Sequence, residues 1–468
     1  MTAQIHEECG VLGVWGIGDA AEIVRTGLAF LQHRGQEGCG IAYADENGDI
    51  LVQRGLGLIS RVFPKAFSHE GKCRSAIGHV RYGTYGGNGV ENVQPFVFRH
   101  RNGDYATAHN GNIVNAQELA TALSARGVLF LSSSDSEIPG ALLGCHLSRH
   151  ADITPQLLSR VLNQVDGAFS FLILTRDALY ACRDKYGLRP LSVGTLGEGF
   201  VAASETCALN ALSATAVRDV EPGEIVKMSA AGMESFVFSP GMRHAICAME
   251  YIYFARPDSD IEGTNVHAFR KETGRILFRE SHVGADLVVG VPDSGLSAAI
   301  GYAEASGIPM EQALVKNFYV ARTFIQPTQE MRASGVRLKL SPVGSLIRGK
   351  RLVVIDDSIV RGTTSRKLIQ MLRDAGAAEI HMRITSPPLK NPCYYGVDIS
   401  SREELISASR SVDQVCRYIG ADTLAFISEE GLKQAGKSTD MCLACFNCDY
   451  PTDLYSHSIV AGGLEEMS

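Results

Sequence analysis

Two adjacent carboxylates end an apolar run in the phrase VVIDDSIVRGTT at 353–364. Asp356 and Asp357 close the expected strand, and the loop SIVRGTT then opens a helix at about Thr363. Backbone N–H groups in such a loop and at a helix N-terminus bind phosphate, while the carboxylates accept hydrogen bonds from ribose hydroxyls or bind Mg²⁺. Open α/β sheets bind ligands at this position, outside the carboxyl ends of their strands. The phrase therefore predicts a sugar-phosphate site.

A second turn of the same kind follows the apolar run DLVVGV. The residues VPDSG at 291–295 place Asp293, Ser294 and Gly295 between a strand and the next helix. Taken alone, Asp293 or Ser294 would also serve as an ordinary N-cap. Two anion-binding turns in one sheet, however, fit a ligand that carries two separated phosphate groups.

A long basic segment, 316–342, lies between two strands of that sheet. Its basic residues are Lys316, Arg322, Arg332, Arg337 and Lys339. A connection of this length inside a compact domain is more often a functional lid than packing. Such a lid would close over a pyrophosphate leaving group and exclude water. The alternative is a solvated, charged excursion of the chain.

Cys9 stands at the head of the apolar strand CGVLGVWG. If residues 1–8 are removed, Cys9 carries both a thiol nucleophile and an α-amine, which titrates near neutral pH and can act as general base. A lone strand cysteine is otherwise most often simply buried. The sequence motifs that accompany Cys9 favour a role as nucleophile over a purely structural one.

Three further phrases supply the groups that an α-amino acid substrate needs. HNGNIVN ends a strand with Asn110 and Gly111, which can direct a side-chain amide and a backbone N–H at a developing oxyanion. HVRYGT offers Arg81 and Thr84, and SSSDSE offers Asp135. Arginine pairs with a carboxylate and aspartate with an ammonium, the two charged ends of a free amino acid.

The run MCLACFNCDYP contains Cys442, Cys445 and Cys448 in the spacing C-x-x-C-x-x-C. These thiolates could ligate zinc or an iron–sulfur cluster, but they are one short of four, so a further ligand must come from elsewhere in the chain. Twelve cysteines in a chain without a secretory signal indicate a reducing compartment, and we expect a cytoplasmic protein.

Composition limits the class of protein. The 468 residues include 44 Lys+Arg and 51 Asp+Glu, a formal net charge of −7, which argues against a nucleic-acid partner. No apolar run approaches the ~18–20 residues that span a bilayer, so we expect no membrane partner.

The order of predicted strands and helices changes near residue 235, which divides the chain into two parts. In the first part we expect strands at 9–16, 39–44, 76–82, 104–111, 168–174 and 199–204, and helices at 22–35 and 115–127. Asn115 is the expected N-cap of the second helix. In the second part we expect helices at 264–281, 295–307 and 363–376, and strands at 286–291, 350–356 and 378–384. The first pattern predicts an α+β sandwich of helices and sheets, and the second an α/β unit with a parallel sheet covered on both faces.

The phrases together resemble the amidophosphoribosyltransferase family over essentially the whole chain. VVIDDSIVRGTT is similar to the phosphoribosyl pyrophosphate (PRPP) loop of type I phosphoribosyltransferases, and MEYIYFARPDS and RTFIQP resemble this family in particular. With LQHRGQEG, the first part resembles a class II, N-terminal-nucleophile glutaminase domain. The resemblance implies a removed propeptide at 1–8, an αββα glutaminase sandwich at 9–235, and a type I phosphoribosyltransferase parallel-sheet domain with a C-terminal cluster-binding segment at 236–468.

The same resemblance implies roles for individual residues. The catalytic set is Cys9, Asn110 and Gly111, and glutamine binds Arg81, Thr84, Gly111 and Asp135. PRPP binds Asp293, Ser294, Gly295, Asp356, Asp357, Ser358, Arg361, Gly362, Thr363 and Thr364, with Mg²⁺ at Ser294, Asp356 and Asp357. Lys316, Arg322 and Lys339 belong to the lid. One [4Fe–4S] cluster is held by Cys247, Cys393, Cys442 and Cys445, with Cys448 as the alternative to either of the last two.

The implied reaction hydrolyses glutamine through a thioester at Cys9 and passes the ammonia to C1 of PRPP. Its products are 5-phosphoribosylamine, pyrophosphate and glutamate, at the entry to purine synthesis. Purine nucleotides are the implied feedback inhibitors, and the implied assembly is a homo-oligomer, a homotetramer in this family. Two alternatives are a PRPP-sensing regulator, which would need a basic DNA-binding module, and a class II amidotransferase with another acceptor, which would lack the IDDSIVRGTT phrase.

Overall fold

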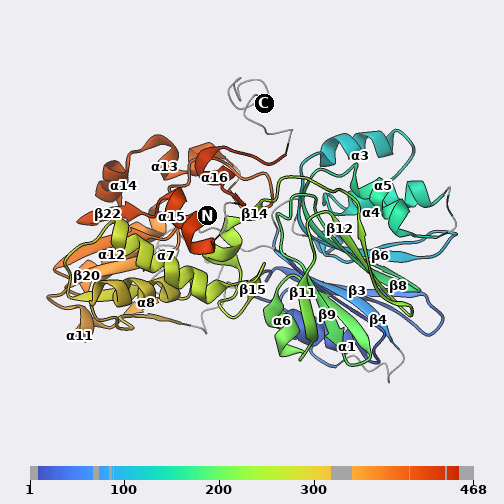
Figure 1. The fold of residues 1–468 in the computed structure, drawn as a ribbon, viewed down its shortest axis with the longest axis horizontal. Helices are drawn as coiled ribbons and strands as arrows, with labels where there is room; N and C mark the ends of the chain where they lie inside the picture. Colours follow the sequence, from blue (N-terminus) through green and yellow to red (C-terminus); the bar gives the residue numbers. More distant parts are fainter. Residues whose placement is uncertain are drawn as a thin grey trace.

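The computed structural model describes residues 9–66, 73–83, 87, 89–148, 150, 152–317, 340–399, 401–437 and 440–452. These residues form two lobes that lie side by side (Figure 1). The last strand of the first lobe is β13 (Gly232–Val237), which pairs with β12 (Glu224–Ser229), and the second lobe begins at β14 (Ile246–Cys247). The boundary that we expect near residue 235 therefore falls inside β13.

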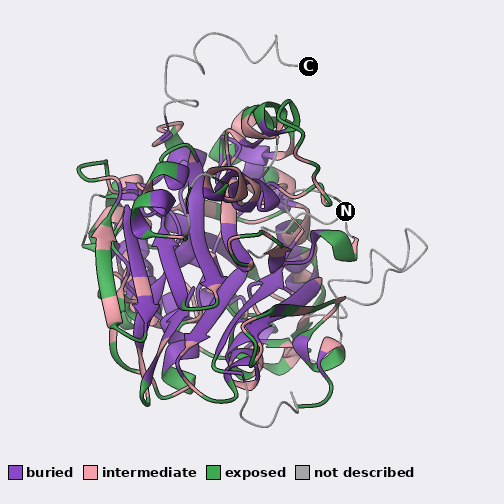
Figure 2. Cartoon of the chain, turned by 90° about the vertical axis from the view of Figure 1, so that its right-hand side faces the viewer, coloured by how far each residue is buried: buried purple, intermediate pink, exposed green. Residues whose placement is uncertain are grey.

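Two antiparallel sheets form the inner layers of the first lobe. Their strand orders are β11-β9-β10-β1-β4-β2-β3 and β13-β12-β8-β7-β6-β5. The strands are β1 (Gly10–Trp15), β2 (Gly38–Ala44), β3 (Ile50–Leu56), β4 (Ser75–Arg81), β5 (Phe96–Phe98), β6 (Tyr105–Ile113), β7 (Gly167–Thr175), β8 (Ala178–Arg183), β9 (Ser192–Leu196), β10 (Gly199–Ala203) and β11 (Thr215–Asp219). Small and branched side chains such as Val11, Ile77, Ala106 and Leu172 fill the space between the sheets. Figure 2 shows the buried strands running through the lobe.

Helices cover the outer faces of both sheets. α1 (Ala20–Phe30) and α6 (Thr206–Ala211) pack on the first sheet. α3 (Ala116–Ser124), α4 (Glu137–Leu147) and α5 (Pro155–Leu162) pack on the second. The shorter α2 (Ile59–Val62) and η1 (Val90–Asn92) lie in connections. This layering confirms the predicted αββα sandwich.

The end of α1 and the side-chain cap of α3 differ from the prediction. α1 ends at Phe30 because the following residues turn back toward β4. Asn115 precedes α3, but its side chain does not cap the helix. Instead its amide donates to Gln164 O and its oxygen accepts from Asp166 N, which ties the helix to the segment before β7.

A parallel sheet forms the centre of the second lobe, in the order β17-β20-β21-β22. Its strands are β17 (Leu287–Gly290), β20 (Arg351–Asp356), β21 (Glu379–Ile384) and β22 (Thr423–Phe426). One face carries α7 (Val266–Glu280), α8 (Gly295–Ser306) and α15 (Glu429–Gly436), and the other carries α12 (Thr363–Asp374) and α14 (Val412–Ile419). The predicted parallel sheet, covered on both faces, is confirmed, and β22 is a strand that the sequence analysis did not include.

Shorter elements complete the second lobe. They are η2 (Glu250–Phe254), a π-helical turn, β15 (Asp260–Ile261), β16 (Thr264–Asn265), β18 (Leu314–Lys316), β19 (Leu340–Pro342), α11 (Gly344–Ile347), η3 (Arg402–Glu404), α13 (Ile406–Ser409), β23 (Met441–Cys442) and α16 (Ala444–Asn447). Among the helices of the described residues, none is both long and apolar enough to cross a membrane.

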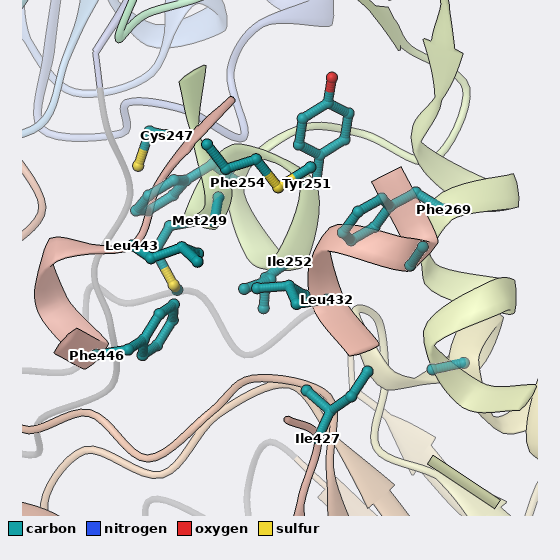
Figure 3. Packing of buried hydrophobic residues seen from close by; sticks show 14 of the residues in the cluster. Cys247, Met249, Tyr251, Ile252, Phe254, Phe269, Ile427, Leu432, Leu443 and Phe446 are labelled. Atoms are coloured by element: carbon teal, nitrogen blue, oxygen red, sulfur yellow. The ribbon is translucent and has the colours of Figure 1, made fainter. Parts of the chain in front are cut away.

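The end of the described chain packs against the start of the second lobe. β23 pairs in parallel with β14, which sets Cys442 opposite Cys247. Figure 3 shows Leu443 and Phe446 in the apolar cluster that also contains Met249. Residues almost two hundred positions apart in the sequence are thereby held in one core.

Candidate active sites

Cys9 lies at the start of β1, beside the end of β4. Its neighbour Gly10 pairs with Val80, and the Cys9 thiol lies 3.5 Å from the carbonyl oxygen of Tyr82. Arg34 donates from Nε to the carbonyl oxygen of Cys9 at 3.0 Å. Gly35 lets the segment that carries Arg34 pack directly on β4, because a Cβ at this position would lie 2.6 Å from the β4 backbone.

Asn110 lies in β6 and is 1% exposed. Within the part of the chain that the structure describes, neither polar atom of its side chain has a hydrogen-bond partner. A buried polar group left without a partner is costly, so its persistence indicates a ligand-binding position. Gly111 follows with φ +142, and a Cβ there would lie 2.0 Å from Ala168 O, so this backbone conformation requires glycine.

The two charged residues expected to hold an amino acid are both buried. Asp135 accepts a hydrogen bond from the backbone N–H of Ile113 in β6 at 2.9 Å. Arg81 closes β4 and donates from Nη2 to Gly87 O at 3.0 Å. Thr84 lies outside the described residues.

A buried polar network holds these strands together, and the sequence analysis did not anticipate it. Gln94 accepts from His109 N at 2.7 Å and donates to Ser136 Oγ at 3.1 Å, and His109 Nδ1 lies 2.8 Å from the same hydroxyl. His79 Nε2 lies 3.1 Å from His109 O, which joins β4 to β6. The neighbours of Arg81, Asn110 and Asp135 are thus bonded to one another. The histidines that open the phrases HVRYGT and HNGNIVN are the sequence feature from which this network could have been predicted.

The predicted sugar-phosphate turns meet at one edge of the parallel sheet. β17 and β20 are neighbours, and Ser294 Oγ donates a hydrogen bond to Asp357 Oδ2. The N–H of Asp357 donates to Asp356 Oδ1 at 3.0 Å. Gly295 permits this close packing, because a Cβ there would lie 2.5 Å from Ile355 O.

Electrostatics at this edge favour a cation. Burial, reinforced by the neighbouring Asp357 carboxylate, raises the pKa of Asp356 well above its ordinary value. Burial also raises the pKa of Asp357, although hydrogen bonds from Ser294 and Ser358 oppose that shift. Two carboxylates, Asp357 buried and Asp356 partly buried, and a hydroxyl are oxygen donors of the kind that Mg²⁺ takes, and its charge would stabilise both anions.

The loop after Asp357 leads into α12, as the anion-binding reading requires. Gly362 adopts φ +71 immediately before the helix, and Thr363 and Thr364 form its first turn. N–H groups at such a helix start lack partners within the helix and can bind phosphate. Arg361 forms an ion pair with Glu404 at 2.5 Å.

The predicted lid falls mostly outside the described residues, which exclude 318–339 and therefore Arg322 and Lys339. Lys316 ends β18, which pairs antiparallel with β19. Its ammonium group forms an ion pair with Asp293.

Four cysteines gather near the meeting point of the lobes. Cys247 and Cys442 are paired across β14 and β23, and backbone N–H groups of residues 390 and 391 donate to Cys445 O, which brings the segment of Cys393 onto α16. Burial raises the pKa of Cys445 well above its ordinary value, and the nearby thiols of the other three add to the shift. The backbone N–H of Tyr395 donates to Cys393 Sγ at 3.3 Å.

Cys448 packs against the same apolar cluster as Cys442 and Cys393 but differs from the four in its electrostatics. It is partly exposed at the end of α16, and burial rather than a neighbouring thiol raises its pKa. Over the described ranges, no group of three or more His, Cys, Asp or Glu side chains is placed to hold a single metal ion.

Comparison with known proteins decides the family. A glutamine amidotransferase domain model matches residues 87–211, in the first lobe. An amidophosphoribosyltransferase of Bacillus subtilis (strain 168) is 51% identical over 97% of this chain and 96% of its own length, and one of Staphylococcus aureus (strain COL) is 47% identical over 97% and 92%. The chain belongs to the amidophosphoribosyltransferase family. Members of this family are glutamine-dependent pentosyltransferases that carry out the first step of purine biosynthesis, so the predicted enzyme class and function are confirmed.

Two solved structures agree with the whole amidophosphoribosyltransferase architecture. One is described as the allosteric regulatory enzyme of purine biosynthesis, with TM-score 0.90, 51% identity, and coverage of 96% of this chain and 97% of that one. The other is the glutamine PRPP amidotransferase of B. subtilis complexed with ADP and GMP, with TM-score 0.89, 49% identity and coverage of 96% and 98%. Both lobes therefore have the fold that the resemblance implied.

The buried histidine network should make stability fall in mild acid. Burial, with Arg81 and His109 adding to it, lowers the pKa of His79 to about 3, whereas the unfolded chain protonates histidine near pH 6.5. Stability from this residue is complete above pH 6.5 and should fall below it by about 1.4 kcal/mol per pH unit. Urea unfolding between about pH 7 and pH 5 should show a shallower fall for His79→Gln. The exposed His150→Gln is the control, and an equal slope in all three proteins would contradict a neutral, buried His79.

Proposed function

We propose that the first lobe hydrolyses glutamine at Cys9 and that the second lobe uses the ammonia to convert PRPP to 5-phosphoribosylamine and pyrophosphate. The observation that carries the glutaminase assignment is the buried Asn110 amide, without a partner among the described residues, beside Gly111. The hydrogen bond between Ser294 and Asp357 supports the PRPP assignment, because it joins the two predicted phosphate turns.

Residues of the first lobe account for each step of glutamine hydrolysis. Removal of residues 1–8 would free the α-amine of Cys9 to take the thiol proton as the sulfur attacks the substrate amide. Asn110 Nδ2 and the Gly111 N–H would then donate to the oxyanion. Arg81 would bind the substrate carboxylate and Asp135 its ammonium group. The α-ammonium would pass the thiol proton to the amide nitrogen, so that ammonia leaves as the thioester forms, and water then releases glutamate and restores the thiol.

Residues of the second lobe would hold PRPP for attack by ammonia at C1. Asp293, Ser294 and Gly295 form one turn, and residues 358–364 form the other with the start of α12. Mg²⁺ at Ser294, Asp356 and Asp357 would neutralise charge on the pyrophosphate leaving group. Pairing with Asp293 places Lys316 beside the first turn, where a cation also favours that group.

The four gathered cysteines fit a [4Fe–4S] cluster better than a single ion. Cys247, Cys393, Cys442 and Cys445 supply the four thiolates that such a cluster takes. The hydrogen bond from Tyr395 N to Cys393 Sγ is of the type that tunes cluster sulfurs. Neighbouring thiols add to the raised pKa of Cys445, whereas burial raises the pKa of Cys448, which favours Cys442 and Cys445 as the ligands from this run.

Purine nucleotides are the proposed inhibitors, because the B. subtilis relative was solved with ADP and GMP, which like PRPP are ribose phosphates. The homotetramer and the cytoplasmic location stay predictions.

The glutaminase assignment predicts separable activities. The active chain should begin at Cys9 by intact mass. Cys9→Ser should abolish glutamine-dependent synthesis, and Asn110→Ala should lower its kcat by about 10²- to 10³-fold, while ammonia-dependent synthesis persists in both. Asn115→Ala is the matched control, since its amide only ties α3 to residues 164 and 166. Full activity in chains that retain Met1 would exclude the α-amine as base.

The PRPP assignment predicts that Asp357→Asn lowers kcat/KM for PRPP by about 100-fold, or ~2.7 kcal/mol, with either nitrogen source. Labelling of Cys9 by a glutamine-like affinity reagent should continue, because the first lobe keeps its own site. Asp413→Asn, an exposed acid on the same lobe, should leave PRPP kinetics unchanged. Normal PRPP kinetics in Asp357→Asn would refute this site.

The cluster assignment predicts about four irons per chain and a brown colour after anaerobic purification. Cys393→Ser should lose iron, colour and solubility, because the site joins distant segments and so adds folding free energy. Cys448→Ser should keep its iron. Iron analysis and the visible spectrum test this, and a colourless active protein with stoichiometric zinc or no metal would overturn the assignment.

A further inference from the structure

The guanidinium that holds Cys9 is itself held by the second lobe. Arg34 donates from Nε to Cys9 O at 3.0 Å, and its other two nitrogens donate to Glu250 at 3.0 and 2.7 Å. Arg34 Nη1 also donates to Glu205 of the first lobe at 2.6 Å. Arg34 is 1% exposed, so its orientation is set by these acceptors rather than by solvent.

Glu250 opens the π-helical turn η2 and is completely buried. Arg189, also fully buried, donates from Nη1 to Glu250 Oε1 at 3.3 Å, so one carboxylate joins two arginines of the first lobe. Bidentate pairing of a carboxylate with arginine fixes direction as well as distance. The position of the Cys9 backbone therefore depends on a side chain that lies outside the glutaminase lobe.

The second lobe also contacts the strand of Asn110. Asn112 donates from Nδ2 to Tyr394 O at 2.9 Å, and Arg189 donates from Nη2 to Tyr395 O. Gly396 follows with φ +108, and a Cβ there would lie 3.3 Å from the carbonyl carbon of Gly111. Residues 394–396 thus rest directly on the backbone that would supply the oxyanion hole.

We infer that the glutaminase centre is completed by the second lobe, with Glu250 as a positioning residue that holds Cys9 through Arg34. The inference rests on the proposed role of Cys9 as nucleophile. Glu250 acts on Cys9 through Arg34, so its removal should misplace the thiol without removing a reacting group. A displacement of about 1 Å at a reacting atom can lower a rate by about 100-fold.

A matched control exists at the same junction. Glu262 of the second lobe accepts from Arg183 of the first at 2.7 Å and contacts His244 at 2.8 Å, but no described contact links it to Cys9. Glu262→Gln therefore tests the effect of a weakened junction alone, whereas Glu250→Gln also removes the charged, bidentate partner of Arg34.

The experiment compares both variants, together with Cys9→Ser, in the full mature chain. In Glu250→Gln, kcat for glutamine and the rate of affinity labelling at Cys9 should fall together by about 10- to 100-fold, with KM for glutamine within about twofold. Ammonia-dependent synthesis should be retained, which also reports correct folding. In Glu262→Gln, kcat and KM for glutamine, the labelling rate at Cys9 and the rate of ammonia-dependent synthesis should all stay within about twofold of the unmodified protein.

Glu250→Asp covers the case in which Glu250→Gln does not fold, since it keeps the charge but withdraws the carboxylate by one methylene. Supporting outcomes are a selective loss of kcat and labelling in either Glu250 variant. Normal labelling, or an equal loss of both activities in both Glu250 variants, would overturn the inference. Retention of glutamine-dependent activity in Cys9→Ser would instead refute the proposed function itself.

Discussion

The two lobes depend on a set of opposite charges buried where they meet. Arg34, Arg189, Glu205 and Glu250 are each at most 1% exposed, and their formal charges sum to zero. Burial alone would raise the pKa of Glu205, but His33, Arg34 and a hydrogen bond from Ser259 hold it well below its ordinary value, so the carboxylate stays charged. Breaking such a set by removing one member typically costs about 3–5 kcal/mol, because a charge is left buried without its partner. The relative placement of the lobes is therefore fixed by charge pairing as well as by apolar contact.

Each lobe places its chemistry at the ends of strands, for different reasons. In the second lobe, neighbouring parallel strands end at the same edge, so Ser294 and Asp357 meet although they lie 63 residues apart. In the first lobe, the strands of two antiparallel sheets are joined by the His79 contact with His109 O. Rigid strands thus carry the proposed reactive side chains, and hydrogen bonds between neighbouring strands fix the orientation of those side chains.

Sequence patterns predicted what depends on short segments. Short apolar runs located β1, β4, β6 and β20, because strands that are buried on both faces carry apolar or small residues at consecutive positions. Asn115 occupies the predicted N-cap position, but its side chain does not cap the helix, since it bonds to Asp166 N and Gln164 O of a distant segment instead. The partners of Gln94, Arg34 and Glu250 were not predictable from spacing, because each bond joins residues from different elements. Resemblance supplied the roles of Cys9 and Asp357, but not the contacts that hold them.

The order in which the ribosome makes these residues has a further consequence. Arg34 is synthesised 216 residues before Glu250, and Arg189 206 residues before Tyr395. At ~5–20 residues per second, Glu250 is made roughly 10–40 s after Arg34. Before Glu250 emerges, the acceptors available to Arg34 are Cys9 O and Glu205 of its own lobe, so water must solvate the donors that later bind Glu250. The surface that becomes the junction therefore stays hydrated until the later segments emerge, and the restraint that reaches Cys9 through Glu250 is added only as the lobes close together.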